Sequence, residues 1–389
     1  MNPRAAPDTP AEGRKMVATI EQALDTIRAG GMVILVDDED RENEGDIVAA
    51  AATITPEQLT IMARQARGLI CLAMAPEMCE RLGLEQMVSR NTAPFATAFT
   101  ISIDARQGVT TGISSRDRAT TIRKAIDPTS GPADFVTPGS VFPLRAVAGG
   151  VLSRTGQTEG SVDLARLAGL PAAGVICEVL RDDGTMMRLA ELEEFGRRLD
   201  MPVCTVADLV AYRLRTEKLV HEVATAELPT DFGDFKVRAF ASSLDDRTHL
   251  ALVLGDVSGD DPVLVRVHRA NFPGDTFQFR EGRGRADVEE ALGLISEAGR
   301  GVFLYLNREE TGADLLASLE RVAHDVDPTH QLDRAVGLES RMTFRDFGIG
   351  AQILRELNLT RLRVLTNNPK RFSALAGFGL TAEEFIPLP

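Results

Sequence analysis

Histidine is absent from the first 220 residues of this 389-residue chain. All five histidines come later, at His221, His249, His268, His324 and His330. Imidazole is the side chain whose ordinary pKa lies closest to neutral pH, and it is the commonest general acid or base in enzymes. Any proton transfer in the first half of the chain must therefore use other groups.

Long apolar runs, excess positive charge and paired cysteines are also lacking. No run approaches the roughly 20 apolar residues of a membrane-spanning helix, and residues 1–14 are rich in proline and polar side chains, unlike a signal peptide. The net charge of −14, without a basic stripe, argues against a nucleic-acid partner. Four cysteines without C-x-x-C spacing favour buried, reduced thiols in a cytoplasmic protein: Cys71, Cys79, Cys177 and Cys204.

Apolar runs that alternate with helical patterns predict an α/β (α+β) protein with two domains. We expect a disordered tail (residues 1–16), a first domain (17–214), a polar linker (215–230) and a second domain (231–389). Strands are predicted at 32–36, 68–74, 99–103 and 174–177, with helices at 56–65 and 114–125, in the first domain. The second has predicted strands at 250–254, 262–268, 301–306 and 362–365, and helices at 286–298 and 347–357.

The most informative stretch of the sequence is acidic. Residues 37–46 contain seven carboxylates and one arginine, directly after the apolar run 32–36. That run would place the carboxylates at the end of a sheet, where α/β proteins usually bind ligands. Such close like charges repel one another unless a cation or a polyhydroxy ligand lies among them, and oxygen ligands of this kind suit Mg²⁺. A solvated acidic loop is the alternative.

Three other features carry more polar character than packing needs. Residues 108–118, with Thr111, place glycines and hydroxyls before a helix start, where free amides favour a phosphate. Residues 149–160 contain Arg154, which can bind a phosphate through two hydrogen bonds, and Thr158, a candidate helix cap. Glu178 follows a buried run. Each has an ordinary structural explanation, but together they supply what an enzyme acting on a sugar phosphate needs.

These segments resemble 3,4-dihydroxy-2-butanone 4-phosphate synthase, the riboflavin-pathway enzyme that uses Mg²⁺ to convert ribulose 5-phosphate into that butanone phosphate and formate. The resemblance covers residues 17–213, through 37–46, 99–105, 108–122, 142–146, 161–169 and 183–186. It implies a homodimer. It also implies contacts to the pentose phosphate by Arg41, Asp46, Arg154, Thr158 and Glu178, a Mg²⁺ or Mn²⁺ ligand at Glu42, and proton transfer by Glu178. We add Thr111 and Gln157 as candidates for the sugar-phosphate site, Gln157 for the metal site, and Glu44 and Ser140 for the catalytic positions.

Two positions depart from the family pattern. Where the family has Pro-Gly-His-Val-Phe-Pro-Leu, this chain has Ser140 in place of the catalytic histidine. Where the family has Gly-His-Thr-Glu-Ala, this chain has Gln157 in place of the metal-binding histidine. An amide oxygen is still a ligand that Mg²⁺ accepts. Serine cannot replace a positioned imidazole as a general acid or base. Loss of such a group typically lowers the reaction rate by on the order of 100 to 10,000-fold. We expect Glu178, Glu44 or a water to transfer the protons instead, with the family reaction slowed or redirected.

From about residue 232 the sequence resembles GTP cyclohydrolase II, over 265–268, 274–277, 302–306, 345–354 and 365–370. The resemblance implies a second α/β domain with zinc on three cysteines. Their positions are Asn271, Gly282 and Gly284 here, and the domain contains no cysteine. Since glycine offers zinc no ligand, we expect neither zinc nor cyclohydrolase activity, and a scaffold that aids folding, dimerisation or regulation.

Two functions are therefore predicted. The first is a Mg²⁺-dependent, lyase-type enzyme that acts on ribulose 5-phosphate or a close relative. The alternative is a catalytically silent paralogue with a binding or regulatory role, which the loss of key groups in both domains favours.

Overall fold

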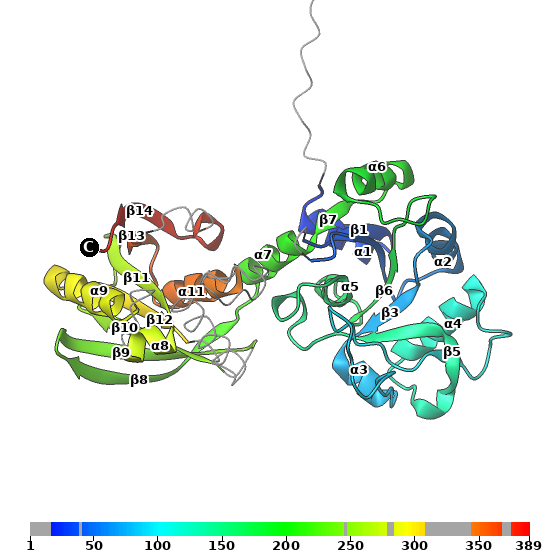
Figure 1. Ribbon diagram of the computed structural model, residues 1–389, viewed down its shortest axis with the longest axis horizontal. Helices are drawn as coiled ribbons and strands as arrows, with labels where there is room; N and C mark the ends of the chain where they lie inside the picture. Colours follow the sequence, from blue (N-terminus) through cyan, green and yellow to red (C-terminus); the bar gives the residue numbers. More distant parts are fainter. Residues whose placement is uncertain (1–16, 39–40, 245–246, 278–283, 308–343, 368–374) are drawn as a thin grey trace, which may run out of the picture. The chain divides into compact units, whose positions relative to one another are not determined.

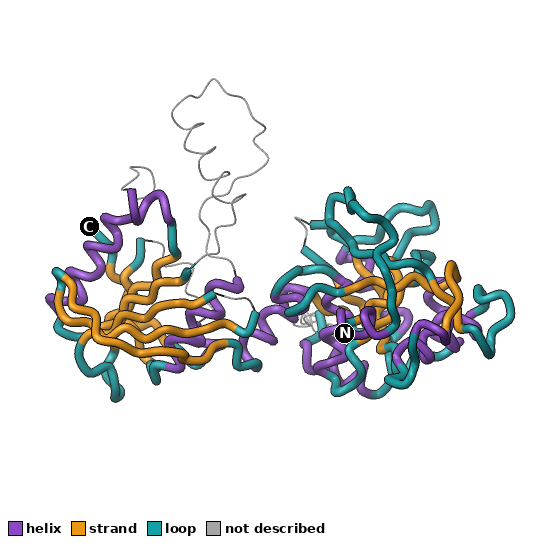
Figure 2. The backbone as a smooth tube through the Cα atoms, turned by 90° about the horizontal axis from the view of Figure 1, so that it is seen from below, coloured by secondary structure: helices purple, strands orange, loops and turns teal. Residues whose placement is uncertain are grey.

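The computed structural model describes residues 17–38, 41–244, 247–277, 284–307, 344–367 and 375–389. The expected disordered tail, residues 1–16, lies outside the described residues. The chain divides into two compact units, Met1–Tyr212 and Arg213–Pro389. Each unit contains a seven-stranded sheet with helices packed on it (Figure 1 and Figure 2). The predicted two-domain α/β (α+β) architecture is confirmed.

The first sheet has the strand order β4-β5-β3-β6-β2-β1-β7. Its pairs β3–β5 and β1–β7 are parallel, and the others are antiparallel. The strands are β1 Met32–Val36, β2 Gly45–Ala50, β3 Cys71–Met74, β4 Ile103–Ala105, β5 Phe135–Arg145, β6 Ala173–Glu178 and β7 Val203–Thr205. All residues of β1, β2 and β3 are buried, so the sheet is covered on both faces there.

Helices pack on both faces of the first sheet. They are α1 Ile20–Arg28, α2 Pro56–Ile61, α3 Pro76–Arg81, α4 Ser115–Ile126, α5 Gln157–Leu167, α6 Leu189–Leu199 and α7 Val206–Thr216. A methyl group added at Gly160 of α5 would lie 2.4 Å from Leu35 Cδ2, and one added at Gly196 of α6 would lie 3.3 Å from Ile34 Cδ1. Because neighbouring residues of a strand face opposite sides, α5 and α6 lie on opposite faces of β1.

Short-range signals explain where these helices begin and end. The Thr19 side chain accepts a hydrogen bond from the Gln22 amide and caps α1, which ends before Gly30 at a φ of 81°. The Ser114 side chain caps α4 in the same way, through the Asp117 amide. Helix α5 differs, because its N-cap Gly156 has no side chain and makes no cap hydrogen bond. Thr158, the candidate cap, lies inside the first turn.

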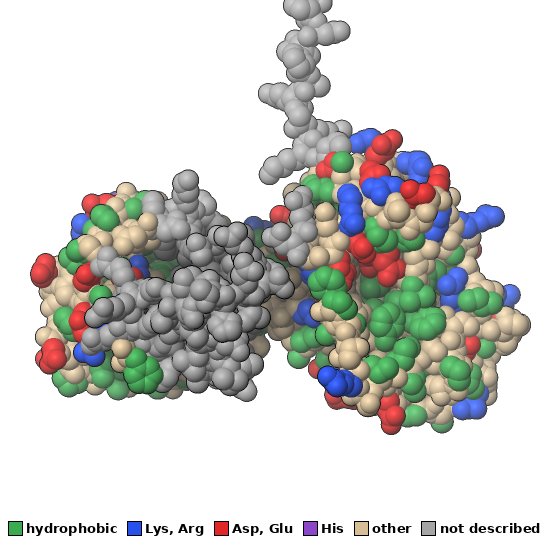
Figure 3. Space-filling model, in the orientation of Figure 1, with side chains coloured by type: hydrophobic (Ala, Val, Ile, Leu, Met, Phe, Trp, Pro, Cys, Tyr) green, Lys and Arg blue, Asp and Glu red, His purple; other side chains and the backbone are tan. Residues whose placement is uncertain are grey.

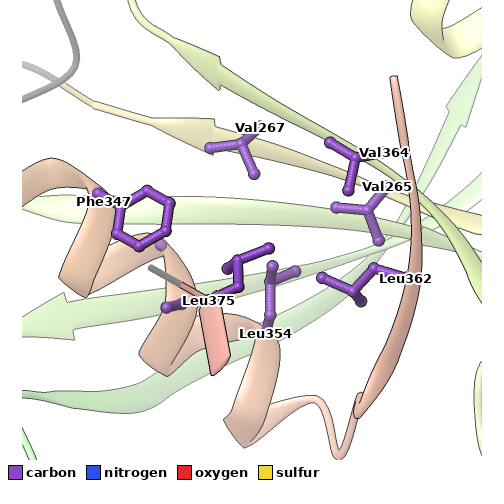
Figure 4. A pocket seen from close by; sticks show the side chains of 9 residues that line it. Val265, Val267, Phe347, Leu354, Leu362, Val364 and Leu375 are labelled. Carbon is purple, nitrogen blue, oxygen red and sulfur yellow. The ribbon is translucent and has the colours of Figure 1, made fainter. Parts of the chain in front are cut away.

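The second sheet has the strand order β14-β13-β11-β12-β10-β9-β8. Its strands are β8 Val220–Thr230, β9 Gly233–Ser242, β10 Thr248–Leu254, β11 Val263–Arg269, β12 Gly301–Leu306, β13 Arg361–Leu365 and β14 Thr381–Ile386, with helices α8 Phe272–Phe277, α9 Gly284–Ala298 and α11 Phe344–Glu356. Helix α9 packs with Leu264 and Phe303 on one face, and α11 packs with Val265 and Leu304 on the other. Between α11 and the sheet, Val267, Phe347 and their neighbours line a small apolar cavity (Figure 4).

Two predicted elements differ from the structure. The predicted linker is mostly strand: residues 220–230 form β8, which pairs with β9 along its whole length. Nine of its eleven residues are exposed, so backbone hydrogen bonds rather than burial hold it, and no apolar pattern marks it. The strand predicted at 99–103 is limited to β4, residues 103–105. The prediction for the cysteines holds, because all four are buried and free. Among the described residues, no helix is long and apolar enough to cross a membrane.

Candidate functional site

The acidic run forms the turn between β1 and β2, and Asp37 organises it from inside. The Asp37 side chain is fully buried. It accepts hydrogen bonds from the amides of Glu42 at 3.2 Å and Glu44 at 2.8 Å, and from Arg41 Nη1 at 2.7 Å. From the sequence, Asp37 was interpreted only as one carboxylate of the acidic run 37–46. Its position at the end of a buried strand was the signal that it folds inward.

The start of helix α5 faces this turn. Arg41 Nη1 donates to Gln157 Oε1 at 2.8 Å, and Gln157 Nε2 donates to the Glu44 carbonyl at 3.4 Å. The amide oxygen expected at the metal site therefore accepts from Arg41. Gln157 and Thr158 are both buried in the first turn of α5.

Two guanidinium groups meet at the uncapped end of α5. Arg154 Nη1 pairs with the buried Glu159 at 2.5 Å, and its Nη2 donates to the Phe95 carbonyl at 3.0 Å. A methyl group added at Gly156 would lie 2.6 Å from Arg154 Nη1 and 3.2 Å from Arg41 Nη2. Arginine side chains next to a helix N-terminus with free amides form a site that suits an anion.

Asp46 and Glu178 lie side by side at the ends of neighbouring strands. They are register partners on β2 and β6. Glu178 Oε2 accepts a hydrogen bond from the Leu69 amide at 2.8 Å, and a methyl group at Gly68 would lie 2.5 Å from the same oxygen, so only glycine fits there. Asp46 is 4% exposed, and its carboxylate receives no hydrogen bond from the described residues.

Burial and like charge raise the pKa of these carboxyl groups. Burial raises the pKa of Asp46 well above its usual range, and the charges of Glu178, Glu42 and Glu44 add to the effect. Burial also raises the pKa of Glu178, and that of Glu44 together with the neighbouring Glu42. A divalent cation beside these carboxyl groups would offset the repulsion among them and lower their pKa values.

Ser140 lies in a separate part of the sheet. Its amide donates to Asp104 Oδ1 at 3.0 Å, and its hydroxyl lies 3.4 Å from Asp104 Oδ2. A methyl group at Gly112 would lie 2.1 Å from the same carboxylate oxygen, which places the exposed Thr111 close by. Strand β3 separates the strands of Ser140 and Glu178. The role of Asp104 was not predicted from the sequence, and among the described residues no hydrogen bond joins Thr111 to Arg41 or Glu178.

The phosphate site predicted at residues 108–118 is already filled by the protein. Asp117 Oδ2 accepts hydrogen bonds from the Thr110 amide and hydroxyl at 3.1 and 2.7 Å and from the Gly112 amide at 3.2 Å. These hydrogen bonds, above all the one from the Thr110 hydroxyl, lower the pKa of Asp117. The amides that were expected to bind a phosphate thus hold a carboxylate of the same segment.

Carboxylate oxygens are suitable ligands for a hard divalent ion, but the carboxylates of this site do not form a complete coordination shell. No three histidine, cysteine, aspartate or glutamate side chains of the described chain stand in a metal-binding arrangement. Asp46, buried and without a hydrogen bond, together with Glu42 and Glu44, offers the oxygen atoms that Mg²⁺ prefers. One or two such carboxylates, with waters and substrate oxygens, complete a typical Mg²⁺ shell.

Comparisons with known proteins cover both units. Residues 21–212 match the family model of 3,4-dihydroxy-2-butanone 4-phosphate synthase, and residues 221–387 match that of GTP cyclohydrolase II. Riboflavin biosynthesis protein RibBA of Aquifex aeolicus is 48% identical to this chain over 95% of the chain and 92% of that protein. The chain belongs to the 3,4-dihydroxy-2-butanone 4-phosphate synthase family, with a fused GTP cyclohydrolase II family domain. The RibBA of Bacillus subtilis is 44% identical over 96% of this chain and 94% of its own length.

Solved structures of the synthase family agree with the fold. The crystal structure of RibBX, a two-domain 3,4-dihydroxy-2-butanone 4-phosphate synthase from A. baumannii, has a TM-score of 0.76 and 36% identity, and covers 96% of this chain and 100% of that chain. A 3,4-dihydroxy-2-butanone 4-phosphate synthase in complex with two magnesium ions has a TM-score of 0.50 and 41% identity, over 51% of this chain and 98% of that chain.

The raised pKa of Asp46 predicts a pH-dependent gain in stability on its removal. The folded protein holds this proton more tightly than the unfolded chain, so stability present at acid pH is lost as the pH rises through the raised pKa. Asp46→Asn removes that loss. In the presence of a chelator, we expect the substitution to raise the melting temperature more at pH 8 than at pH 5. The exposed Asp182→Asn is the control, and an equal shift at both pH values would contradict the prediction.

Proposed function

We propose that this chain is a Mg²⁺-dependent lyase that converts ribulose 5-phosphate into 3,4-dihydroxy-2-butanone 4-phosphate and formate for riboflavin biosynthesis. The observation that carries the proposal is the pair of the buried Asp46 and the half-buried Glu178, which lies beside the acidic turn that also holds Arg41. Carboxylates for a cation and for proton transfer thus lie next to guanidinium groups for a phosphate. Membership of the synthase family supports the same reaction.

The phosphate of the substrate would bind at the start of α5. Arg41 and Arg154 provide guanidinium donors close to Gly156, beside Thr158 in the first turn of the helix. Hydrogen bonds to charged groups contribute about 1.5–3 kcal/mol each, roughly twice those between neutral groups. Both arginines are already held, by Asp37 and Glu159, so little side-chain entropy is lost when an anion binds.

Glu42, with Asp46 beside it, would hold the Mg²⁺ or Mn²⁺ ion. Gln157 can take part, because an amide oxygen has two lone pairs and can accept from Arg41 while facing a cation. When bound, the ion would polarise the carbonyl group of a ketose. The role of Gln157 toward Arg41 is to fix the guanidinium for the anion.

Glu178 and Glu44 are the groups proposed to move protons. Their raised pKa values bring them toward neutral pH, where a carboxyl group can both accept and donate a proton. Ser140, held by Asp104, supplies a hydroxyl but no group that titrates near neutrality. The proposed reaction is therefore slower than with an imidazole, by on the order of 100 to 10,000-fold.

A catalytically silent paralogue with a binding or regulatory role is the second candidate. The observation that favours it is the Ser140–Asp104 contact, which occupies the catalytic position implied by the resemblance with a hydrogen-bonded hydroxyl. Such a protein would bind ribulose 5-phosphate at the same arginines without turnover.

Formate release from ribulose 5-phosphate distinguishes the two candidates. We expect Mg²⁺-dependent formate from the unmodified chain, and a loss of at least about 100-fold in rate for Glu42→Gln, since the ion would lose a carboxylate ligand. Glu77→Gln, an exposed glutamate of α3, is the control. Binding of the sugar phosphate without formate would support the silent paralogue.

The same assay includes a gain-of-function arm. Ser140→His combined with Gln157→His should raise formate release by about 100-fold or more, because it restores a positioned acid–base group. No gain in a folded double variant that still binds the substrate would mean that the site has lost its catalytic geometry.

For the second unit we propose that zinc-dependent ring opening of GTP is absent. A methyl group added at Gly284 would lie 2.5 Å from the Gly274 carbonyl carbon, and one added at Gly274 would lie 2.5 Å from Asn271 Nδ2. Helices α8 and α9 therefore pack too closely at Gly284 for a cysteine side chain unless the backbone moves. Gly282 lies outside the described residues.

Zinc analysis tests this proposal. We expect the purified protein to contain substoichiometric zinc, and GTP to remain unchanged when zinc is added, because three thiolate ligands are missing from the sequence. Zinc bound at one ion per chain, or formate released from GTP, would contradict the proposal.

We also propose that two copies pair over the site. Large exposed apolar side chains border it: Leu69, whose amide binds Glu178; Phe95, whose ring lies 5.2 Å from the Arg41 guanidinium carbon; and Val147, whose amide binds Glu159. Figure 3 shows hydrophobic side chains gathered beside acidic ones on this unit. A second copy would bury them and exclude water from the reaction.

Sedimentation analysis tests the pairing. We expect a dimer, and dissociation into monomers when the exposed Leu69 and Val147 are both changed to aspartate, since two buried charges would oppose association. Val223→Asp, at a similarly exposed valine of the second unit, should leave the dimer intact. A monomeric unmodified chain would contradict the proposal.

A further inference from the structure

Arg188, the residue before α6, grips the acidic turn from outside. Its Nη1 donates to the carbonyl oxygen of Glu42 at 3.0 Å and also to that of Asn43. Both acceptors are main-chain atoms, so the guanidinium group of Arg188 binds the backbone of the turn and not the carboxylates of Glu42 and Glu44. The Glu42 carboxylate lies 3.1 Å from Arg41 Nη1 instead.

The turn needs such a contact because its backbone is bent sharply. Asn43 has a φ of 54°, in the left-handed region, which a side chain disfavours. Asp37 binds the amides of Glu42 and Glu44 on the inner side. Arg188 binds the carbonyl groups of the same segment on the outer side. Together, Asp37 and Arg188 bind both the amide groups and the carbonyl groups of the turn.

Arg188 is itself anchored by the start of α6. Its amide donates to Glu191 Oε2 at 3.1 Å, and Arg181 binds the two oxygens of Glu191 at 2.7 and 2.6 Å. One turn further, Leu192 packs against the turn, because a methyl group added at Gly45 would lie 2.4 Å from Leu192 Cδ1. The first turn of α6 thus holds the acidic turn by a hydrogen-bonded contact and an apolar one.

We propose that Arg188 is a positioning residue that fixes Glu42 and Glu44 for a divalent cation. The role in cation binding rests on the proposed function, whereas the role in fixing the turn does not. A positive charge beside a cation site weakens binding by Coulomb repulsion. If Arg188 nevertheless strengthens binding, it does so through the geometry of the turn.

Hydrogen exchange of the cation-free protein tests the role of Arg188 in fixing the turn. In Arg188→Gln, we expect the amides of Glu42 and Glu44, which bind Asp37, to exchange at least about tenfold faster, because the turn opens more often. Arg198→Gln, which removes the same charge from the exposed side of α6, is the matched control. Unchanged exchange of both amides in Arg188→Gln would overturn the proposal.

Mn²⁺ binding, followed by electron paramagnetic resonance, tests the consequence for the cation. Loss of groups that orient metal ligands typically costs about 10 to 100-fold in affinity, so we expect Arg188→Gln to bind Mn²⁺ at least about tenfold more weakly. Arg188→Lys keeps the charge and one donor, and should fall between Arg188→Gln and the unmodified chain. Tighter binding by Arg188→Gln would mean that Arg188 acts only as a charge, which overturns its role toward the cation.

The two measurements separate the inference from the proposed function. If the unmodified chain binds no Mn²⁺, the proposed metal-dependent reaction fails, while hydrogen exchange still decides whether Arg188 holds the turn. If the unmodified chain binds Mn²⁺ and Arg188→Gln binds it equally well with unchanged exchange, the inference fails and the proposed function stands.

Discussion

Repulsion among carboxylates at the ends of β1, β2 and β6 is the constraint on which the first unit depends. Asp37, Asp46 and Glu178 are brought together by strand register, which the apolar side chains of the sheet fix. A slip of one residue would turn every side chain of a strand to the other face. Because the core sets the register, the unfavourable charge arrangement is maintained by packing elsewhere in the unit.

Two aspartates of the same turn show how this arrangement divides structural from functional groups. Asp37 is fully buried and accepts hydrogen bonds from Arg41, Glu42 and Glu44, so its charge is compensated by the protein. Asp46 is equally buried, yet its carboxylate receives no hydrogen bond from the described residues, and burial raises its pKa. Burying a carboxylate without a hydrogen-bond donor from the protein is costly, and buried carboxyl groups with raised pKa values are typical of functional centres.

The sequence predicted the parts of the structure that have a strong local pattern. The sequence alone predicted the buried run 32–36 and the acidic turn after it. It also predicted Glu178 at a strand end and the helices after Thr55 and Ser114. Strand β8 was not, because an edge strand exposed on both faces has no apolar periodicity. Asp117 and Asp104 were missed for another reason: their roles depend on which backbone amides and side chains the fold brings to them.

The surroundings of Ser140 in the first unit and of Gly284 in the second unit differ in how tightly they are packed. In the first unit, Ser140 occupies an open, partly exposed position and the surrounding carboxylates and arginines remain. In the second unit, Gly284 lies directly against Gly274, where two helices are in contact. A larger side chain at Gly284 would therefore require the two helices to separate, because a closely packed interior has no room for added atoms.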